Sequence, residues 1–290
     1  WLSHSLEDTG IWSILGFSNV AQIMTNDGYF APTSNFNPYT HTWSLGVEEQ
    51  FYLLIPILLI LLRRKILFLA VSLLSMFSLF LAVYYSTANQ VVAFYSLFTR
   101  FWELGVGVLL AIIFNFRIVQ KSVVFLQRSI YYLSIKQALI LFGLLGIALP
   151  AIYLNPSIHT PWPGSLLPVL GTTLIILSTF LDENVPNNRF LPLRSFLISP
   201  FLVWFGFISY ALYLWHWPVI IFYQLHFETE LKALDKIVVL ACSILLGILS
   251  YYFIEERFRK RVSSMVKPAK RVYFQVATMS AALCFVVYGL

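Results

Sequence analysis

The sequence predicts an all-α fold, a polytopic bundle of about eight transmembrane helices, and three observations support this prediction. Hydrophobic residues make up 59% of the 290 residues and charged residues only 11%, against roughly a quarter charged in soluble domains. Apolar stretches of about 20 residues, the length that crosses a bilayer, recur along the chain. These stretches are continuous and lack the alternating pattern of a membrane barrel strand, so each predicts a helix.

Eight apolar segments are predicted to form these helices, because each approaches the length that spans about 30 Å of hydrocarbon at 1.5 Å per residue. The segments lie near residues 44–62, 66–85, 95–114, 138–154, 164–181, 199–224, 237–254 and 272–290.

The basic residues of the loops predict the orientation of the chain, since cytoplasmic loops are enriched in Lys and Arg. Alternate loops, at 63–65, 117–136, 189–194 and 257–271, hold 16 of the 19 basic residues. That side is predicted to be cytoplasmic. Three regions follow: an extracytoplasmic loop segment at 1–43, a transmembrane core at 44–261, and a linker with one more helix at 262–290.

Several other classes of function are disfavoured by composition. The net charge of +6 comes from residues spread over loops rather than gathered on one face, so no nucleic-acid partner is expected. Cys242 and Cys284 fall in apolar stretches without metal-ligand spacing, and no metal is expected. The chain begins at Trp1 without a signal-peptide pattern, so we expect it to be a fragment of a longer protein.

The first polar feature is HTWSLGVEEQFY at 41–52, which places Glu48 and Glu49 near the outer end of the first predicted helix. One interpretation is structural, since the helix dipole stabilises acids near an N-terminus. A capping box, however, needs its acid three residues after a Ser or Thr. The residues at those positions are Leu45 and Val47. Capping therefore explains Ser44 better than it explains the carboxylates, and at least one of them is predicted to have a functional or network role.

The second feature is an intramembrane pair, Arg100 and Glu103, spaced to meet on one helix face. Two interpretations stay open. The pair can be a structural ion pair, or the planar guanidinium can bind a phosphate or carboxylate.

The third feature is SYALYLWHWPV at 209–219. Tyr210, Tyr213 and Trp217 form an aromatic stripe at helical spacing, with His216 beside it. Such a stripe is more often packing than chemistry, whereas a histidine inside a membrane is as often functional as structural. Pro218 is expected to free a backbone carbonyl just there.

The fourth feature is the charged boundary YYFIEERFRKR at 251–261. A salt-bridged belt at the membrane interface is the simpler interpretation. The alternative is a basic cluster that attracts an anionic cytosolic ligand, such as a nucleotide-bearing cofactor.

Five stretches, in this order, resemble the integral-membrane acyltransferase 3 family, bacterial O-acetyltransferases of cell-surface glycans. They are HTWSLGVEEQFYLLIP (41–56), FYSLFTRFWELGVGVLLA (94–111), TPWPGSLLPVLGTTLI (160–175), ISYALYLWHWPV (208–219) and SYYFIEERFRKR (250–261). The resemblance implies a core of ten helices, with an eleventh in members that carry a C-terminal SGNH-type domain. It therefore implies that helices are missing upstream and a domain is missing downstream.

The resemblance also implies a function: transfer of an acetyl or similar group from cytosolic acetyl-CoA (acyl-CoA) to a hydroxyl of an extracytoplasmic glycan acceptor. Examples are O-antigen, lipopolysaccharide or exopolysaccharide, and the setting is the lipid of a bacterial plasma (inner) membrane. On this basis Glu48, Glu49 and His216 are predicted to be catalytic. The predicted substrate contacts are Trp43, Tyr52, Arg100, Glu103, Tyr210 and Tyr213. The predicted contacts to the coenzyme's phosphates are Arg257, Arg259 and Arg261.

The chain departs from the family pattern in one respect. The family's catalytic histidine lies in its first helices, and His4 and His41 lack that motif, so the fragment alone is expected to be inactive. Two alternatives are a transporter or flippase of a lipid-linked glycan and a structural membrane subunit.

Overall fold

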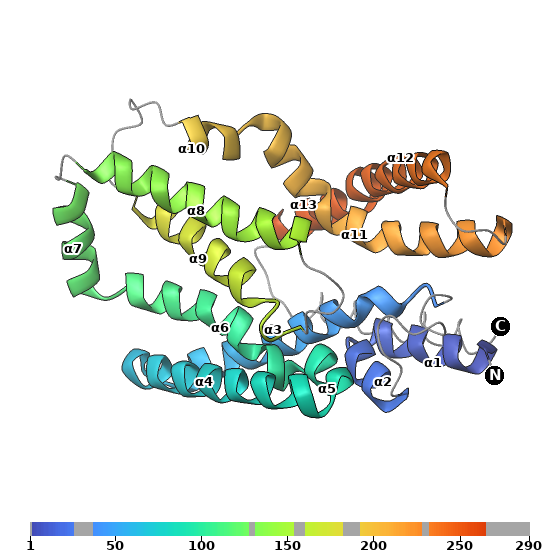
Figure 1. The fold of residues 1–290 in the computed structure, drawn as a ribbon, viewed down its shortest axis with the longest axis horizontal. Helices are drawn as coiled ribbons and strands as arrows, with labels where there is room; N and C mark the ends of the chain where they lie inside the picture. The colour runs from blue at the N-terminus through green and yellow to red at the C-terminus, as the bar shows by residue number, and fades with distance from the viewer. Residues whose placement is uncertain are drawn as a thin grey trace. The chain divides into compact units, whose positions relative to one another are not determined.

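The computed structural model describes residues 2–25, 37–127, 131–153, 160–181, 192–227 and 232–264. Within these ranges every regular element is helical, as the all-α prediction requires. The chain divides into two compact units. Unit 1 comprises residues 1–47 and 200–290, and unit 2 comprises residues 48–199. Figure 1 shows the helices of both.

Six helical spans among the described residues are long and apolar enough to cross a membrane: Thr40–Leu61, Arg64–Ala88, Gln90–Phe114, Tyr132–Tyr153, Pro200–Phe227 and Ala233–Lys260. They confirm six of the predicted segments. The segment predicted near 164–181 is α9, Leu166–Phe180. At 1.5 Å per residue this helix extends only about 22 Å, short of the hydrocarbon thickness. The predicted segment 272–290 lies outside the described residues.

The segment before residue 44, predicted to be an extracytoplasmic loop segment, contains short helices that the sequence analysis did not predict. Helix α1 is Leu2–Ile14, α2 is Ser18–Thr25, and the 3₁₀ turn η2 is Thr40–Thr42. Helices this short are marginal alone and need tertiary packing. Their buried side chains are mostly polar, including Thr9 and Asn19, so the segment shows no apolar helical stripe that sequence reasoning could detect.

Unit 1 holds α1, α2, η2, the start of α3 (Trp43–Leu61), and the helices after residue 199. These are α11 (Pro200–Phe227), α12 (Ala233–Ser250), the π-helical turn η3 (Tyr251–Glu255) and α13 (Glu256–Ser264). Helices α11 and α12 pack side by side (Figure 1). Their backbones approach closely at Gly247, where an added Cβ would lie 3.1 Å from the Leu212 Cα atom.

Unit 2 continues α3 and adds α4 (Arg64–Ala88), α5 (Gln90–Tyr95), α6 (Leu97–Phe114), α7 (Arg117–Gln127), α8 (Tyr132–Tyr153), α9 and α10 (Pro192–Leu197). Helices α4 and α6 form one packed pair and α8 and α9 another (Figure 1). The buried core beside the first pair includes Phe51 of α3, Val71 of α4 and Phe101 of α6. The side chains of Asn89 and Ser96 cap α5 and α6 by accepting hydrogen bonds from backbone N–H groups.

Candidate functional site

Two residues of the aromatic stripe of α11 form hydrogen bonds to residues 37–44, around the start of α3, within unit 1. The Tyr213 hydroxyl donates a hydrogen bond to the carbonyl oxygen of His41, and it lies 2.6 Å from the Ser44 Oγ atom. Because the tyrosine has one proton, Ser44 is the donor to it. One turn further on, Trp217 Nε1 donates to the Asn37 carbonyl at 2.9 Å. The stripe predicted from spacing is thus a set of specific polar contacts as well as packing.

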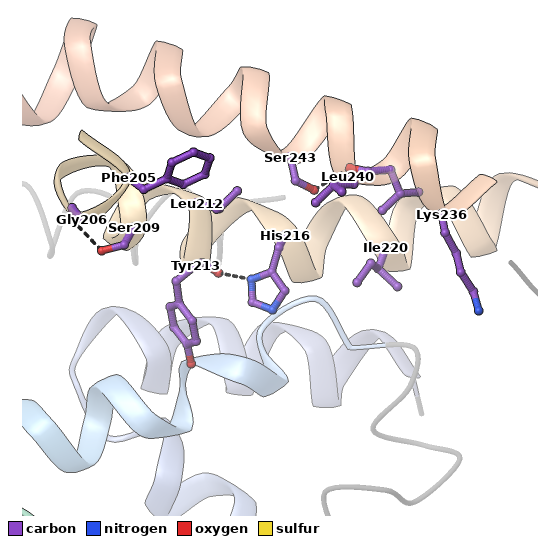
Figure 2. A pocket seen from close by; sticks show the side chains of 11 residues that line it. Phe205, Gly206, Ser209, Leu212, Tyr213, His216, Ile220, Lys236, Leu240 and Ser243 are labelled. Carbon is purple, nitrogen blue, oxygen red and sulfur yellow. Dashed lines mark hydrogen bonds between the residues drawn. The ribbon is translucent and has the colours of Figure 1, made fainter. Parts of the chain in front are cut away.

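His216 lies on the same helix and has a defined tautomer when neutral. Its Nδ1 atom is 2.6 Å from the Tyr213 carbonyl oxygen. A carbonyl only accepts, so Nδ1 carries the proton and Nε2 has a lone pair. Figure 2 shows this bond, with Tyr213 and His216 extending from the same side of α11.

His41 is the residue that sequence reasoning excluded and the structure brings to this cluster. Its ring centroid lies 5.6 Å from that of His216 and 5.2 Å from that of Tyr213. The side chain is buried, and neither ring nitrogen has a well-formed hydrogen bond within the described residues. His41 and Tyr213 are 172 positions apart in the sequence, so no local pattern indicated this contact.

Pro218 explains why a polar ring is accommodated beside α11. Proline has no N–H, so the carbonyl of Leu214 lacks the donor that a regular helix would supply. The carbonyls of Leu214 and Pro38 lie beside the His41 ring. The sequence predicted that Pro218 frees a backbone carbonyl, and in the structure the carbonyl of Leu214 lies beside His41.

A cavity of about 770 Å³ opens between α11 and α12 beside His216 (Figure 2). Its lining residues are Phe205, Gly206, Ser209, Leu212, Tyr213, His216, Ile220, Lys236, Val239, Leu240 and Ser243. The hydroxyls of Ser209 and Ser243 are engaged, since each donates to a carbonyl of its own helix. The cavity therefore offers apolar walls, the imidazole of His216, and Lys236 at one end.

The predicted pairing of Arg100 and Glu103 is confirmed in unit 2. Arg100 Nη1 lies 3.2 Å from Glu103 Oε2, and the side chains are 12% and 18% exposed. Arg100 Nε donates to the Phe94 carbonyl, and the guanidinium stacks over the Phe94 ring. The second oxygen of Glu103, Oε1, is buried without a partner among the described residues. Both residues of the pair lie on α6, and Oε1 of Glu103 remains as an acceptor without a donor among the described residues.

The other predicted residues of α3 differ from one another in exposure. Glu48 is half-buried and Glu49 exposed, and no ion pair to either carboxylate occurs within the described ranges. Tyr52 is 62% exposed, and Trp43 is half-buried at the start of the helix. Their catalytic and substrate-binding roles stay predictions.

The three predicted arginines all lie in α13 and differ in their contacts. The Arg257 guanidinium stacks on the Phe253 ring, whereas Arg259 donates to the Tyr251 hydroxyl at 3.1 Å. Arg259 also lines a second cavity in unit 1, of about 630 Å³. The side chain of Arg261 lies outside the described part of the chain.

Tyr210 lines this second cavity rather than the first. The predicted stripe is therefore divided between the two cavities, because Tyr213 lines the first and Tyr210 the second.

Comparison with known proteins identifies the chain's relatives. A protein of Staphylococcus aureus strain COL, whose name describes it provisionally as an O-acetyltransferase, is 30% identical over 263 residues, covering 86% of this chain and 41% of the relative. The O-acetyltransferase OatA of S. aureus strain NCTC 8325 is 28% identical over 263 residues, covering 87% and 41%. The chain thus spans about two fifths of the length of these relatives. No solved structure matches it.

The profile of one protein family, described as an acyltransferase domain, matches residues 4–256. This range includes the lining of the first cavity and the Arg100–Glu103 pair, and it ends before Phe258 and Arg259 of the second cavity. The resemblance drawn from five short stretches is confirmed: the chain belongs to the acyltransferase 3 family.

Proposed function

We propose that the chain is the membrane part of an O-acyltransferase that moves an acetyl or similar group from cytosolic acyl-CoA to a hydroxyl of an extracytoplasmic glycan. The observation that carries this proposal is the family match over residues 4–256, with relatives named as O-acetyltransferases. The six membrane-length spans support a multi-pass protein. The proposed acceptors are O-antigen, lipopolysaccharide or an exopolysaccharide, and the proposed setting is the bacterial plasma membrane.

The chemistry needs a group that takes the hydroxyl proton. As the new C–O ester bond forms and the C–S thioester bond breaks, the proton leaves the acceptor and ends on the departing thiolate. An imidazole with a lone pair at hydrogen-bond reach can carry it. His216 supports this role because Nδ1 donates to the Tyr213 carbonyl, which leaves Nε2 as the acceptor.

The remaining predicted residues would position the two substrates. Glu48 and Glu49, near the outer end of α3, would receive the glycan. Arg259 lines the cavity near the C-terminal end of α12. It is therefore placed better than Arg257 to contact a phosphate. The resemblance also implies a catalytic histidine upstream, and the residues of this chain would act together with it.

The proposal is tested in cells that lack other O-acetyltransferases and express the complete open reading frame. Ester-linked acetate is released from the surface glycan by mild alkali and measured. We expect His216→Ala to lower acetate at least about a hundredfold, the usual contribution of general base catalysis. His226→Ala is the matched control, because His226 is exposed at the end of the same helix and should retain activity.

Two results would contradict the proposal. One is the absence of glycan-bound acetate when the intact protein is present at normal abundance. The other is translocation of a lipid-linked glycan that does not depend on acyl-CoA, which would favour a transporter or flippase.

A further inference from the structure

The junction of α12 and α13 holds a buried carboxylate oxygen without a partner. The chain there forms the π-helical turn η3, Tyr251–Glu255, and such turns occur frequently at functional sites. Glu255, its last residue, has its Oε2 atom buried with no hydrogen-bond partner within the described residues. An acceptor left unsatisfied in this way destabilises the fold unless a ligand meets it.

Arg259 lies one helical turn further on and lines the same cavity of about 630 Å³ as Glu255. The two make no ion pair with each other, although their spacing would allow one. Arg259 instead donates to the Tyr251 hydroxyl and lies over the rings of Tyr251 and Phe207. The cavity thus presents a cation and a carboxylate side by side.

The neighbouring pair shows what this spacing gives without a cavity. Glu256 and Lys260 are also four residues apart, and their charged atoms lie 2.8 Å from each other. Lys260 is 73% exposed. Glu256 and Lys260 thus form a closed pair, in which the two charges bond to each other. Glu255 and Arg259, one residue earlier, form an open pair, since both line the cavity.

The chemistry of the open pair defines a ligand class. A guanidinium with planar N–H donors suits a phosphate, and an unpaired carboxylate oxygen suits an amino group. The lining also includes the apolar side chains of Leu214, Ile254 and Phe258. We propose that this cavity binds a phosphate ester that carries an amino group, with the phosphate at Arg259 and the amino group at Glu255.

Two sources supply this chemistry. One is the headgroup of an aminophospholipid, since the cavity lies at the end of the membrane-length span Ala233–Lys260. The other is the adenine nucleotide end of coenzyme A, and only this source rests on the function proposed above.

The test uses the complete protein and two probes. Phosphatidylethanolamine and phosphatidylglycerol are compared by native mass spectrometry after reconstitution in nanodiscs, and coenzyme A is titrated by calorimetry in the same discs. We expect the wild type to retain the amino lipid over the glycerol lipid, to bind coenzyme A, or both. Glu255→Gln and Arg259→Gln should each weaken that binding about tenfold, as expected for a charge-assisted hydrogen bond.

Matched controls come from the closed pair. Glu256→Gln and Lys260→Gln remove the same charges from the same helix and should bind as the wild type does. If the glutamine variants fail to fold, as judged by gel filtration and thermal unfolding, Glu255→Asp and Arg259→Lys replace them, and both should weaken binding by shortening the carboxylate and removing the planar fork.

Binding of neither probe by the wild type would overturn the proposal, as would equal losses in the open and closed pairs. These readouts do not require acyl transfer. Retention of the amino lipid by a protein that transfers no acetyl group would therefore sustain this site and contradict the proposed function.

Discussion

At the scale of single residues, Tyr213 joins distant parts of unit 1. Its hydroxyl bonds to the His41 carbonyl and to Ser44. We expect Tyr213→Phe to lower the free energy of unfolding by about 1 to 3 kcal/mol, because a buried carbonyl then loses its donor. Thermal unfolding in detergent measures this. Tyr210→Phe is the control and should change stability less, since Tyr210 is 50% exposed. Equal effects would contradict the assignment.

His41 provides a second residue-scale prediction. His41→Phe keeps an aromatic ring against His216 and Tyr213 but removes the nitrogen beside the Leu214 carbonyl, which Pro218 leaves without its helical donor. Because neither ring nitrogen has a well-formed hydrogen bond among the described residues, we expect the free energy of unfolding to fall by less than about 1 kcal/mol. A larger loss in thermal unfolding, partly recovered by His41→Gln, would show that a nitrogen of His41 does bond to that carbonyl.

These residues show why the site could be predicted only in part. The spacing of Tyr213 and His216 predicted that they share a face of one helix, and the structure confirms it. The partner segment at 37–44 lies far away in sequence, and two of its three hydrogen bonds to α11 use backbone carbonyls, which every residue has. Residue types therefore did not indicate its contact with α11, and His41 was excluded for want of a motif.

At the scale of elements, the contact between α8 and α9 depends on glycines. A Cβ added at Gly171 would lie 2.7 Å from the Gly143 carbonyl oxygen, whereas one added at Gly107 meets nothing within 4 Å. Gly to Ala inside a helix normally stabilises by about 1 kcal/mol. We expect Gly107→Ala to raise the unfolding midpoint and Gly171→Ala to lower it. A higher unfolding midpoint for both variants would show that α8 and α9 can move apart without loss of stability, and would contradict this prediction.

A double-mutant cycle distinguishes the two interpretations of the Arg100–Glu103 pair of α6, a structural ion pair or a substrate-binding site. Removing one partner of a buried pair costs about 3 to 5 kcal/mol, whereas replacing both with apolar residues can be nearly neutral. We expect Arg100→Leu and Glu103→Leu each to destabilise strongly and the double variant to destabilise less than either, measured by thermal unfolding. If the stable double variant retains acetyl transfer, the pair is structural. If it loses transfer, the pair binds substrate.

The elements themselves were predictable where hydrophobicity alone defines them. Long apolar helices such as α4 and α12 follow from composition, because a bilayer requires their backbone bonds to be internal. Helices α1 and α2 were missed, since they bury polar side chains and depend on tertiary contacts such as Asn37 to Thr9, at 2.8 Å. The π-helical turn η3 has no marker in its sequence, YYFIE.

At the scale of the whole molecule, the distribution of basic residues predicts sidedness. Helix α7, Arg117–Gln127, has 11 residues, about 16 Å at 1.5 Å per residue, and so is too short to cross the membrane. Its basic residues suit the cytoplasmic surface, where anionic lipids attract them. Asn89, between α4 and α5, belongs to a connection without Lys or Arg. The two sites should therefore lie on opposite sides of the membrane.

Cysteine labelling tests this prediction. In a complete protein carrying Cys242→Ser and Cys284→Ser, single cysteines are placed at Thr87 and Lys121, both exposed. A membrane-impermeant maleimide should label Thr87→Cys in intact cells, whereas Lys121→Cys should react only after permeabilisation. Reaction of Lys121→Cys in intact cells would reverse the orientation. It would also place Arg259 and its cavity outside, away from cytosolic coenzyme A, so the proposed donor site would fail while the lipid alternative for that cavity would survive.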